Sequence, residues 1–360
     1  MKIGIFTFHS CYNYGAVLQA FALKSYVEGT FDSTVGVVDY KCSGNDDLLH
    51  YSKIEPSFIR SNSKLKRLGK KLVYRLFVKP AYKKKCIKFE NFKRAHLSIT
   101  DDMAGHDAVL LGSDQIWNPS ITNGYQDVYF GSSVKGGEGA RIAYAASCGS
   151  ISEFSEENRA ELIRLVGDVD FVGVRESSLC DYLKANGINA VNTADPTFLL
   201  SKEEYVSLLG LKPRPRKKYV LEYVLQKNDA LDELASTVAS ERGCEVVRIC
   251  GYVKRQPVDN GIFDAGPIDF LELMMGADYV VTNSFHGTAF SLIFKKNFNV
   301  LMPDSRSSRL TDLLTRLSLL NRAATDGEVC TEDINYSEVN LELEKFLQES
   351  KGFLNSSIKG

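Results

Sequence analysis

The sequence predicts an α/β protein of two domains, each a parallel sheet flanked by helices. Three observations support this prediction. The chain has 360 residues, which is enough for two ordinary domains. Short apolar runs alternate with segments of helical spacing, the pattern of strand–helix–strand units. A basic stretch with two prolines, at 211–218, interrupts the alternation before it begins again, so it is the best candidate linker.

The first half of the chain repeats the order of strand, polar turn and helix. Its predicted strands are the apolar runs Lys2–Phe8, Val35–Tyr40, Ala108–Leu111, Arg141–Ser147, Asp170–Val174 and Ala190–Val191. Ala16–Val27 has the spacing of a helix, and a second helix is expected after Glu176 as far as Leu183. We therefore assign residues 1–210 to an N-terminal domain.

The second half carries the same order of elements after the candidate linker. Its predicted strands are Tyr219–Leu225, Val246–Ile249, Tyr279–Val281 and Phe298–Met302. The helices expected between them are Ala230–Arg242, Pro267–Gly276 and one that begins near His286. We assign residues 219–335 to a C-terminal domain. Glu338–Leu354 has helical spacing, so residues 336–360 predict a terminal helix that packs back onto the first domain.

Composition excludes several classes of protein. The net charge of −1 argues against a polycation that binds nucleic acid. None of the eight cysteines forms a C-x-x-C pair, so neither a zinc site nor a disulfide framework is expected, and scattered cysteines fit a reducing cytoplasm. The N-terminus lacks the features of a signal peptide, and no apolar run is long enough to span a membrane. Any membrane contact is therefore expected to be peripheral.

The segment 60–94 differs from the rest of the chain in charge. It is rich in Lys and Arg, its one acidic residue is Glu90, and apolar residues such as Leu72 and Phe77 are interleaved with the basic ones. This is the pattern of a basic amphipathic helix on an anionic membrane surface. A solvated helical face predicts the same pattern, and the two interpretations stay open. No recognition motif supports RNA binding.

Polar turns follow many of the predicted strands. They are His9–Gly15, Gly112–Asp114, Cys148–Ser150, Val174–Glu176, Asp195–Thr197 and Thr282–Gly287. Because ligands gather at the carboxyl ends of parallel strands, these turns are expected to meet in one cleft between the domains. They supply cations, a carboxylate and a histidine but no metal-ligand cluster. The sequence contains no dinucleotide fingerprint and no P-loop.

The turn at Thr282–Gly287 carries the clearest chemical signal. It joins a buried strand to a helix that begins at a single histidine, His286. A helix N-terminus offers unpaired N–H groups and a partial positive charge, which suit phosphate or carboxylate. A histidine at such a place can transfer a proton near neutral pH, and Gly287 allows a close approach. The alternative is that His286 only caps the helix or packs beneath it.

The other turn residues also have structural interpretations. Asn13 and Gly15 would form a tight turn before a helix, and Asp114 would cap a helix. The remaining candidates would form ion pairs, Arg175 with Glu176, and Arg306 and Arg309 with Asp304 and Asp312. The residues alone leave these alternatives open.

Six stretches of the chain match, in order, the motifs of one known family. They are NYGAVLQAFAL (Asn13–Leu23), LLGSDQIWN (Leu110–Asn118), YAASCGS (Tyr144–Ser150), VGVRESSLCDYL (Val172–Leu183), ADPTFLL (Ala194–Leu200) and TNSFHGTAFSLIF (Thr282–Phe294). On these residues the chain resembles the polysaccharide pyruvyl transferase family. The resemblance implies two Rossmann-like domains facing a cleft, similar to GT-B glycosyltransferases. It also implies transfer of the enolpyruvyl unit of phosphoenolpyruvate to a sugar, forming a pyruvate ketal, with no cofactor and no metal.

The resemblance also assigns residues to the donor site. His286 matches the family's histidine near phosphoenolpyruvate, Arg175 its V-R-E arginine, and Arg309 a downstream basic residue, with Arg306 as the nearby alternative. Many members carry arginine two residues before the histidine, where this chain has Ser284. The turn residues assigned with them to donor binding are Asn13, Gly15, Asn283, Ser284 and Gly287.

The reaction that the resemblance implies needs an acid, a base and a clamp for the departing phosphate. His286 suits the acid, and Asp114 is the hypothesis for the base. The acceptor is expected to be a bacterial surface glycan or its lipid-linked precursor, such as an undecaprenyl-diphosphate-linked sugar, at the inner face of the cytoplasmic membrane. The competing interpretations are a GT-B glycosyltransferase that uses a nucleotide sugar, and a non-enzymatic scaffold docked on a membrane.

Overall fold

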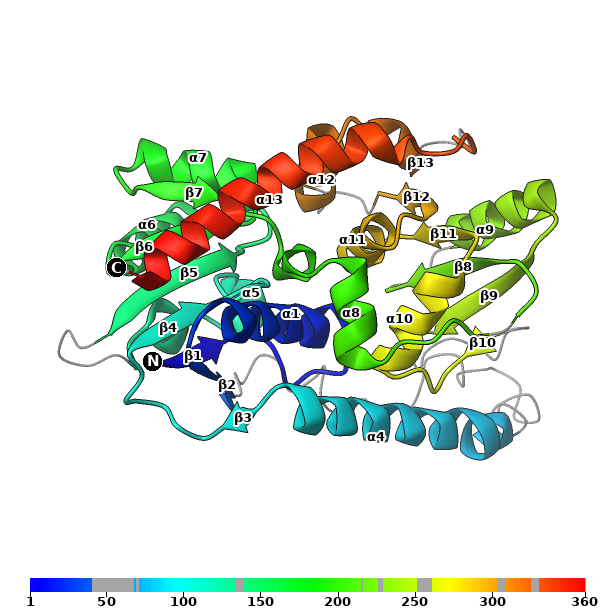
Figure 1. Cartoon of the computed structure of the whole chain (residues 1–360), viewed down its shortest axis with the longest axis horizontal. Helices are drawn as coiled ribbons and strands as arrows, with labels where there is room; N and C mark the ends of the chain where they lie inside the picture. Colours follow the sequence, from blue (N-terminus) through cyan, green and yellow to red (C-terminus); the bar gives the residue numbers. More distant parts are fainter. Residues whose placement is uncertain are drawn as a thin grey trace.

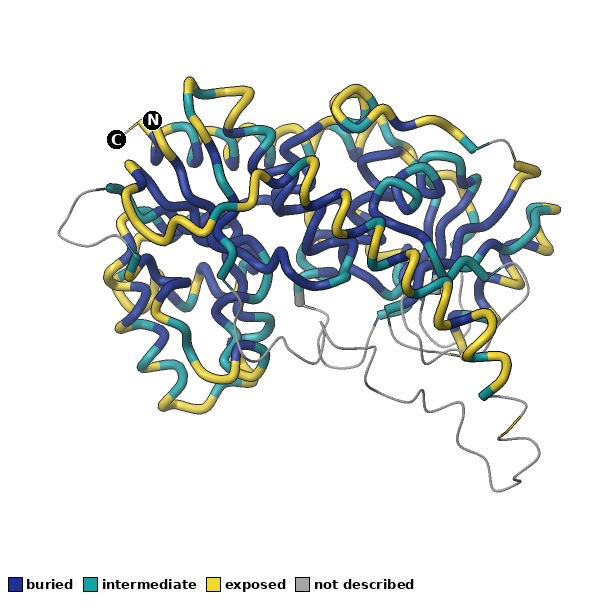
Figure 2. Tube along the Cα trace, turned by 90° about the horizontal axis from the view of Figure 1, so that it is seen from below, coloured by how far each residue is buried: buried dark blue, intermediate teal, exposed yellow. Residues whose placement is uncertain are grey.

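The computed structural model describes residues 1–40, 68, 71–133, 139–214, 216–225, 229–250, 261–302, 308–324 and 330–359. Within them, two parallel sheets lie side by side with helices packed on their faces (Figure 1). The strands of both sheets are largely buried, as the dark blue parts of Figure 2 show. The predicted fold class, two helix-flanked parallel sheets, is confirmed.

The first sheet has the order β3-β2-β1-β4-β5-β6-β7, and all its neighbouring strands are parallel. Its strands are β1 (Lys2–Phe6), β2 (Thr34–Val38), β3 (Ile99–Thr100), β4 (Ala108–Leu111), β5 (Ala140–Ala146), β6 (Phe171–Val174) and β7 (Ala190–Asn192). Its main helices are α1 (Tyr14–Thr30), α6 (Glu156–Val166), α7 (Ser177–Ala185) and α8 (Lys202–Leu209). Shorter pieces are α5 (Pro119–Thr122), η4 (Asp127–Phe130), η5 (Ile151–Glu153) and η6 (Pro196–Leu199). The order reverses between β1 and β4, the kind of switch point where open sheets bind ligands.

The second sheet has the order β10-β9-β8-β11-β12-β13, again parallel throughout. Its strands are β8 (Tyr219–Val224), β9 (Glu245–Cys250), β10 (Gly261–Ile262), β11 (Tyr279–Thr282), β12 (Asn297–Leu301) and β13 (Ala323–Ala324). Its helices are α9 (Asp229–Arg242), α10 (Pro267–Gly276), α11 (Phe285–Ile293), α12 (Ser308–Arg316) and the short η7 (Leu320–Arg322). The two sheets thus draw on residues 2–192 and 219–324, on either side of the candidate linker; the exact domain bounds stay a prediction.

Helix α1 begins earlier in the chain than the sequence pattern predicts. The side chain of Asn13 accepts hydrogen bonds from the backbone N–H groups of Gly15 (2.9 Å) and Ala16 (3.4 Å), so Asn13 is the N-cap and Tyr14 the first helical residue. The contacts of Asn13 are thus those of a residue in the turn before a helix, as its structural interpretation predicts. Since helical spacing does not reveal a cap that precedes the apolar positions, the pattern placed the start at Ala16.

The helices α1, α10 and α11 pack together between the sheets. Tyr14 of α1 stacks on Phe270 of α10, with ring centroids 4.7 Å apart. Its hydroxyl also donates to the backbone oxygen of Ala265, at 2.8 Å. One hydrophobic core continues through this contact from the first sheet to the second. This packing therefore fixes the position of the N-terminal end of α1 relative to that of α11.

Helix α13 (Tyr336–Lys359) runs back from the second sheet to the first, as the red helix of Figure 1 shows. The hydroxyl of Ser350 accepts from the backbone N–H of Ala194 at 2.9 Å, and Tyr26 donates to Asn355 at 3.3 Å. These contacts tie the end of the chain to the first domain.

The described part of the basic segment is helical, with η3 (Tyr74–Val78) leading into α4 (Lys79–His96). Residues 60–67, 69 and 70 lie outside the described residues. Across the described ranges of the chain, no helix combines the length and the apolar content that crossing a bilayer requires.

Candidate functional site

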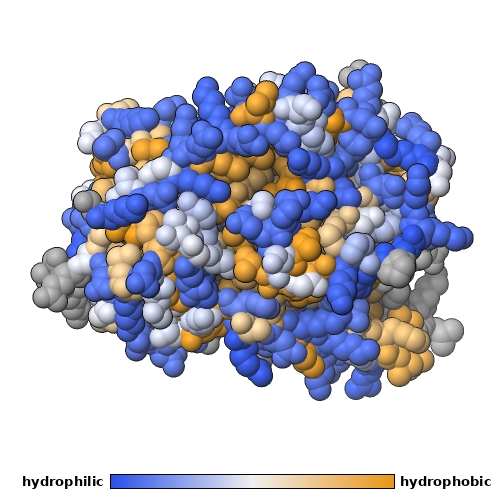
Figure 3. Space-filling model, viewed as in Figure 1, coloured by the Kyte–Doolittle hydropathy of each residue, from blue (hydrophilic) through white to orange (hydrophobic). Residues whose placement is uncertain are grey.

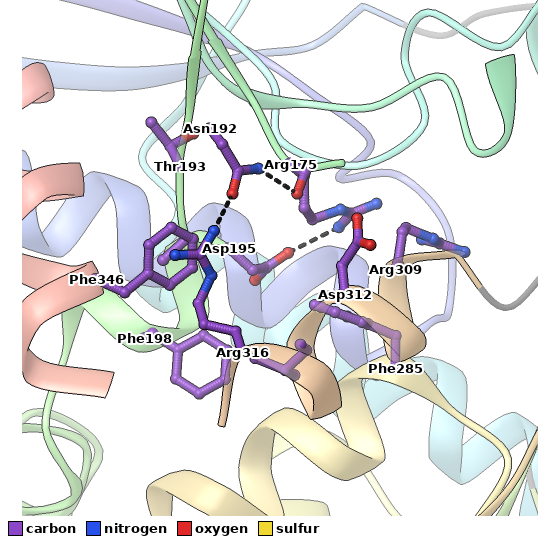
Figure 4. A pocket seen from close by; sticks show the side chains of 12 residues that line it. Arg175, Asn192, Thr193, Asp195, Phe198, Phe285, Arg309, Asp312, Arg316 and Phe346 are labelled. Atoms are coloured by element: carbon purple, nitrogen blue, oxygen red, sulfur yellow. Dashed lines mark hydrogen bonds and ion pairs between the residues drawn. The ribbon is translucent and has the colours of Figure 1, made fainter. Parts of the chain in front are cut away.

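The ends of three strands and one helix bring polar side chains together between the sheets. Arg175 follows β6, Asp195 follows β7, and His286 lies in the first turn of α11, which follows β11. Arg309 is at the start of α12. Figure 4 shows Arg175, Asp195 and Arg309 from close by. The structure thus brings together three of the residues predicted from the sequence and adds Asp195.

Arg175 and Asp195 form the central ion pair. Nη1 of Arg175 lies 2.7 Å from Oδ2 of Asp195, and Arg175 is only 6% exposed. The other carboxylate oxygen of Asp195 accepts from the backbone N–H (3.0 Å) and hydroxyl (2.8 Å) of Thr197. Burial raises the pKa of Asp195, but nearby His286 and Arg175 outweigh it and hold the pKa well below its usual range. Asp195 is therefore a carboxylate in the folded protein.

His286 lies beside this pair at the junction of two helix N-termini. Its Nε2 is 3.6 Å from Oδ2 of Asp195. A Cβ atom on Gly15, in the first turn of α1, would overlap the imidazole ring. Only glycine lets the two helices approach this closely, so Gly15 has a structural reason to be at this position.

The N-terminus of α11 is capped by its own turn. Ser284 is the N-cap, and its hydroxyl accepts from the backbone N–H of Gly287 at 3.3 Å. The side chain of Asn283 accepts from the N–H of Leu225 at 3.0 Å. A Cβ on Gly287 would crowd Thr282. Ser284, Asn283 and Gly287 thus shape the turn that holds His286, and their predicted contacts with a donor stay predictions.

Several buried polar atoms of this cluster have no hydrogen-bond partner among the described residues. They are Nε and Nη2 of Arg175, Oε2 of Glu176 and Nε2 of His286. Buried polar groups are nearly always paired in native proteins, because leaving one unpaired costs about 1–3 kcal/mol. Clustered N–H groups without partners are what a site for an anion with several oxygens requires.

Glu176 is a buried member of the cluster that the sequence did not single out as a site residue. It accepts a short hydrogen bond from the hydroxyl of Ser147. Burial raises the pKa of Glu176, against the opposing effect of Arg175 and Arg309. Its position next to Arg175 in the sequence was visible, but its burial depends on the packing of α7 against β6 and β7 and on Ser147, which follows β5. The sequence-based idea of a surface ion pair between Arg175 and Glu176 is wrong in that both residues are buried.

Arg309 brings a second guanidinium to the cluster. Its Nε lies 4.0 Å from Oε1 of Glu176, and its Cζ lies 5.8 Å from the ring centroid of Phe285, where Arg175 Cζ lies 5.1 Å away. Burial and the nearby Arg175 lower the pKa of Arg309. Two guanidinium groups around one aromatic ring repel each other, and a bound anion would relieve that repulsion.

Asp114 lies at the edge of the cluster. Its Oδ1 is 3.6 Å from Nη2 of Arg175 and accepts from the backbone N–H of Gln115 at 2.9 Å. Asp114 does not cap a helix of the first sheet, because the residues after it form a turn. Its hypothetical role as the base stays a prediction. Arg306 lies outside the described residues.

A recess opens beside the Arg175–Asp195 pair, with a volume of about 330 Å³ that includes space open to solvent. It is lined by Arg175, Asn192, Thr193, Ala194, Asp195, Phe198, Phe285, Arg309, Asp312, Leu313, Arg316 and Phe346 (Figure 4). Residues that follow β6 and β7 of the first sheet line it together with residues of α11, α12 and α13, so the recess lies where the two halves of the chain meet. No group of three or more metal-ligating side chains occurs in the described ranges.

Helix α12 is attached to the first domain at this recess. Asp312 accepts from the backbone N–H (2.9 Å) and the hydroxyl (2.8 Å) of Ser177 at the start of α7. Arg316 donates to the side chain of Asn192 at 2.7 Å. A carboxylate at a helix N-terminus is a favourable contact. These contacts fix the helix that carries Arg309, and they show that Asp312 pairs with Ser177.

Comparison with models of known protein families finds a match over most of the chain. The family model described as "Polysaccharide pyruvyl transferase" matches residues 13–305. No curated protein matches the chain.

Among solved structures the likeness is distant but runs along whole chains. UDP-GlcNAc 2-epimerase from Methanocaldococcus jannaschii is 11% identical, with a TM-score of 0.48 and complete coverage of both chains. The same enzyme from Neisseria meningitidis, bound to UDP-GlcNAc, is 12% identical, with a TM-score of 0.48 and complete coverage of both. The glycosyltransferase SnogD from Streptomyces nogalater is 11% identical, with a TM-score of 0.44, covering 100% of this chain and 98% of its own.

Proposed function

Because this chain belongs to the polysaccharide pyruvyl transferase family, we propose that it transfers the enolpyruvyl unit of phosphoenolpyruvate to a sugar of a bacterial surface glycan or of its lipid-linked precursor. The observation that carries this proposal is the buried Arg175. It is paired through Nη1 with Asp195, but among the described residues its Nε and Nη2 have no hydrogen-bond partner, and His286 and Arg309 lie nearby. Phosphoenolpyruvate brings a carboxylate and a phosphate, which require such a group of fixed donors.

The reaction balances without an oxidant or a reductant. Protonation of phosphoenolpyruvate at C3 gives C2 oxocarbenium character, and a sugar hydroxyl adds there. The C2–O bond to phosphate breaks, and a second hydroxyl of the same sugar closes the ring. The two hydroxyl protons balance the proton gained at C3 and the proton carried away by the released phosphate. The products are a cyclic pyruvate ketal and inorganic phosphate.

The proposal assigns the groups that these steps need to described side chains. Arg175 and Arg309 would hold the anionic oxygens of the donor and stabilise the departing phosphate. His286 would deliver a proton to C3 or to the leaving phosphate. Asp195 would orient His286 and balance its charge across 3.6 Å. Asp114 and Glu176 are the two carboxyl groups available as the base, each close to Arg175.

The test is incubation of the purified protein with phosphoenolpyruvate and synthetic or lipid-linked glycosides. The expected result is release of inorganic phosphate and a product heavier by pyruvate less water in mass spectrometry. Thermal shift with phosphoenolpyruvate and with nucleotide sugars separates the two donor classes. Stabilisation by a nucleotide sugar, with glycosyl transfer and none by phosphoenolpyruvate, would overturn the proposal. Normal biological function of a His286→Ala variant in cells would favour a scaffold instead.

A further inference from the structure

The helix formed by η3 and α4 has two parts of different character. From Phe89 onward its large apolar residues are buried, with Phe89 and Phe92 in the hydrophobic core. Toward its N-terminal end Val78 is buried, but most of the other apolar side chains are exposed. Leu72 and Leu76 are 58% exposed and Phe77 is 67% exposed, with Val73 beside them. In Figure 3 a group of hydrophobic residues, coloured orange, lies at the lower right, over the beginning of this helix.

The basic residues of the helix also divide into two groups. Lys85 and Lys93 are buried: Nζ of Lys85 lies 4.7 Å from the ring centroid of Tyr14, and Lys93 donates to the backbone oxygen of Ser10 at 3.2 Å. Lys88 is paired with Asp269 at 2.8 Å. These three lysines hold α4 against the body of the protein, so any solvated or membrane-facing surface of the segment is formed by its other basic residues.

The second group is solvent-exposed and surrounds the apolar side chains. It consists of Arg75, Lys79, Lys83 and Lys84, for which no ion pair is found in the described part of the chain. Residues 75, 79 and 83 are interleaved with 72, 76 and 77 along the helix, which includes the π-helical turn Tyr74–Val78, so cations and apolar side chains occur close together on it. The sequence contains no acidic residue between Glu55 and Glu90. Cations next to exposed apolar side chains, with no anion among them, match the surface of an anionic bilayer.

We propose that residues 71–84 dock this protein on an anionic lipid surface, with Leu72, Leu76 and Phe77 entering the headgroup region and the exposed cations above it. The positive charge favours this occupant over a second copy of the chain, because two such surfaces facing each other would repel. The docking is peripheral and reversible, and it weakens as salt rises. It rests on the surface alone and does not depend on the reaction proposed above.

The experiment is co-sedimentation of the full chain with vesicles of phosphatidylcholine alone and of phosphatidylcholine with phosphatidylglycerol. The wild type is expected to bind the anionic vesicles at least about tenfold more tightly than the neutral ones, and to lose most of this binding at high salt. Equal binding to both kinds of vesicle, or no binding to either, would overturn the proposal.

Two pairs of variants separate charge and apolar contacts from general effects on the surface. Lys83→Glu with Lys84→Glu should weaken binding by about tenfold or more, whereas Lys217→Glu with Lys218→Glu, two exposed lysines in the linker, should leave it unchanged. Leu76→Ser with Phe77→Ser should weaken binding, but Leu341→Ser on α13, which is 68% exposed, should not. All seven substituted positions are exposed, so folding should be retained, and phosphate release with a soluble glycoside should be the same in every variant.

If the linker pair weakens binding as much as the helix pair, only net charge matters and the assigned surface is wrong. A protein partner is the remaining occupant. It would be indicated if the wild type binds no vesicles and forms a dimer that Leu76→Ser with Phe77→Ser dissociates, as measured by light scattering. Loss of vesicle binding leaves the reaction with soluble glycosides intact, so a failure of this proposal and a failure of the proposed function give different results.

Discussion

At the scale of single residues, His286 is the group whose loss should affect chemistry most. Its Nε2 is buried without a hydrogen-bond partner in the described part of the chain, beside the carboxylate of Asp195. His286→Ala should reduce turnover by roughly 10²-fold or more, because a general acid contributes about that factor. Measured turnover with phosphoenolpyruvate in excess tests this, and circular dichroism checks that the fold is kept.

The matched control is Cys148, which lies in the first domain and is buried like His286. Burial raises the pKa of the Cys148 thiol far above its usual value, so it stays protonated and is a poor nucleophile. Cys148→Ala should therefore keep its turnover. If His286→Ala stays within a few-fold of the wild type, His286 has no part in the mechanism.

Arg309 offers the clean test of donor binding at the residue scale. Arg175→Ala would leave the buried carboxylate of Asp195 without its partner, which costs about 3–5 kcal/mol and confuses binding with folding. Among the described residues, Arg309 forms one distant ion pair, with Glu176 at 4.0 Å, and lies over the ring of Phe285. Arg309→Ala should weaken phosphoenolpyruvate binding by about 10- to 100-fold, the equivalent of roughly 1.5–3 kcal/mol for a charge-assisted contact. Calorimetric titration with phosphoenolpyruvate measures this; an unchanged dissociation constant would remove Arg309 from the donor site.

At the scale of elements, the approach of α1 to α11 decides where His286 lies. A Cβ on Gly15 would overlap its imidazole ring, whereas Gly29 near the other end of α1 has nothing close to it. Gly15→Ala should therefore reduce turnover nearly as much as His286→Ala. Gly29→Ala should keep turnover and, in a helix, raise stability by up to about 1 kcal/mol. Turnover and the thermal midpoint of both variants provide the check, and equal turnover of the two would show that this contact is not needed.

Asp312 of helix α12 should affect donor binding indirectly, by fixing the position of Arg309. Asp312 and Arg316 attach the helix to Ser177 and Asn192, and the same helix carries Arg309. Asp312→Asn removes the charge at the N-terminus of α7, so phosphoenolpyruvate binding should weaken by about three- to tenfold, equal to roughly 1 kcal/mol. Thr315→Ala, an exposed change on the same helix, is the control. A rise in the Michaelis constant for the glycoside alone would contradict this role.

At the scale of the whole molecule, the sequence predicted the sheets better than the site. Alternating apolar runs report local burial, and that is enough to place most strands and the main helices. The partners of a side chain depend on packing between distant elements. Asp195 was visible as a strand-end turn, but its pairing with Arg175 and His286 needs β6, β7 and α11 to meet. The burial of Lys85 could not be predicted either, because a basic amphipathic pattern does not show which lysine faces the interior.

The continuity of the core between the two sheets predicts how the molecule unfolds. A single hydrophobic cluster includes Tyr14 and Phe21 of α1 together with Phe270 of α10 and Phe290 of α11. The ring of Tyr14 stacks on Phe270, and its hydroxyl donates to the backbone at Ala265, so the first helix of one domain is bound into the other. Calorimetry should therefore record one unfolding transition for the whole chain, which phosphoenolpyruvate shifts upward because it binds the folded state.

Tyr14 is the residue that tests this coupling. Tyr14→Phe keeps the stacked ring and loses only the hydrogen bond, so the single transition should remain, at a cost of about 1 kcal/mol. Tyr14→Ala also removes the ring and should cost about 3–5 kcal/mol, concentrated where the domains meet. Because each sheet keeps most of its own core, the domains should then unfold in two separate transitions. Two transitions in the wild type, or one unchanged transition in Tyr14→Ala, would show that the shared core does not couple the domains.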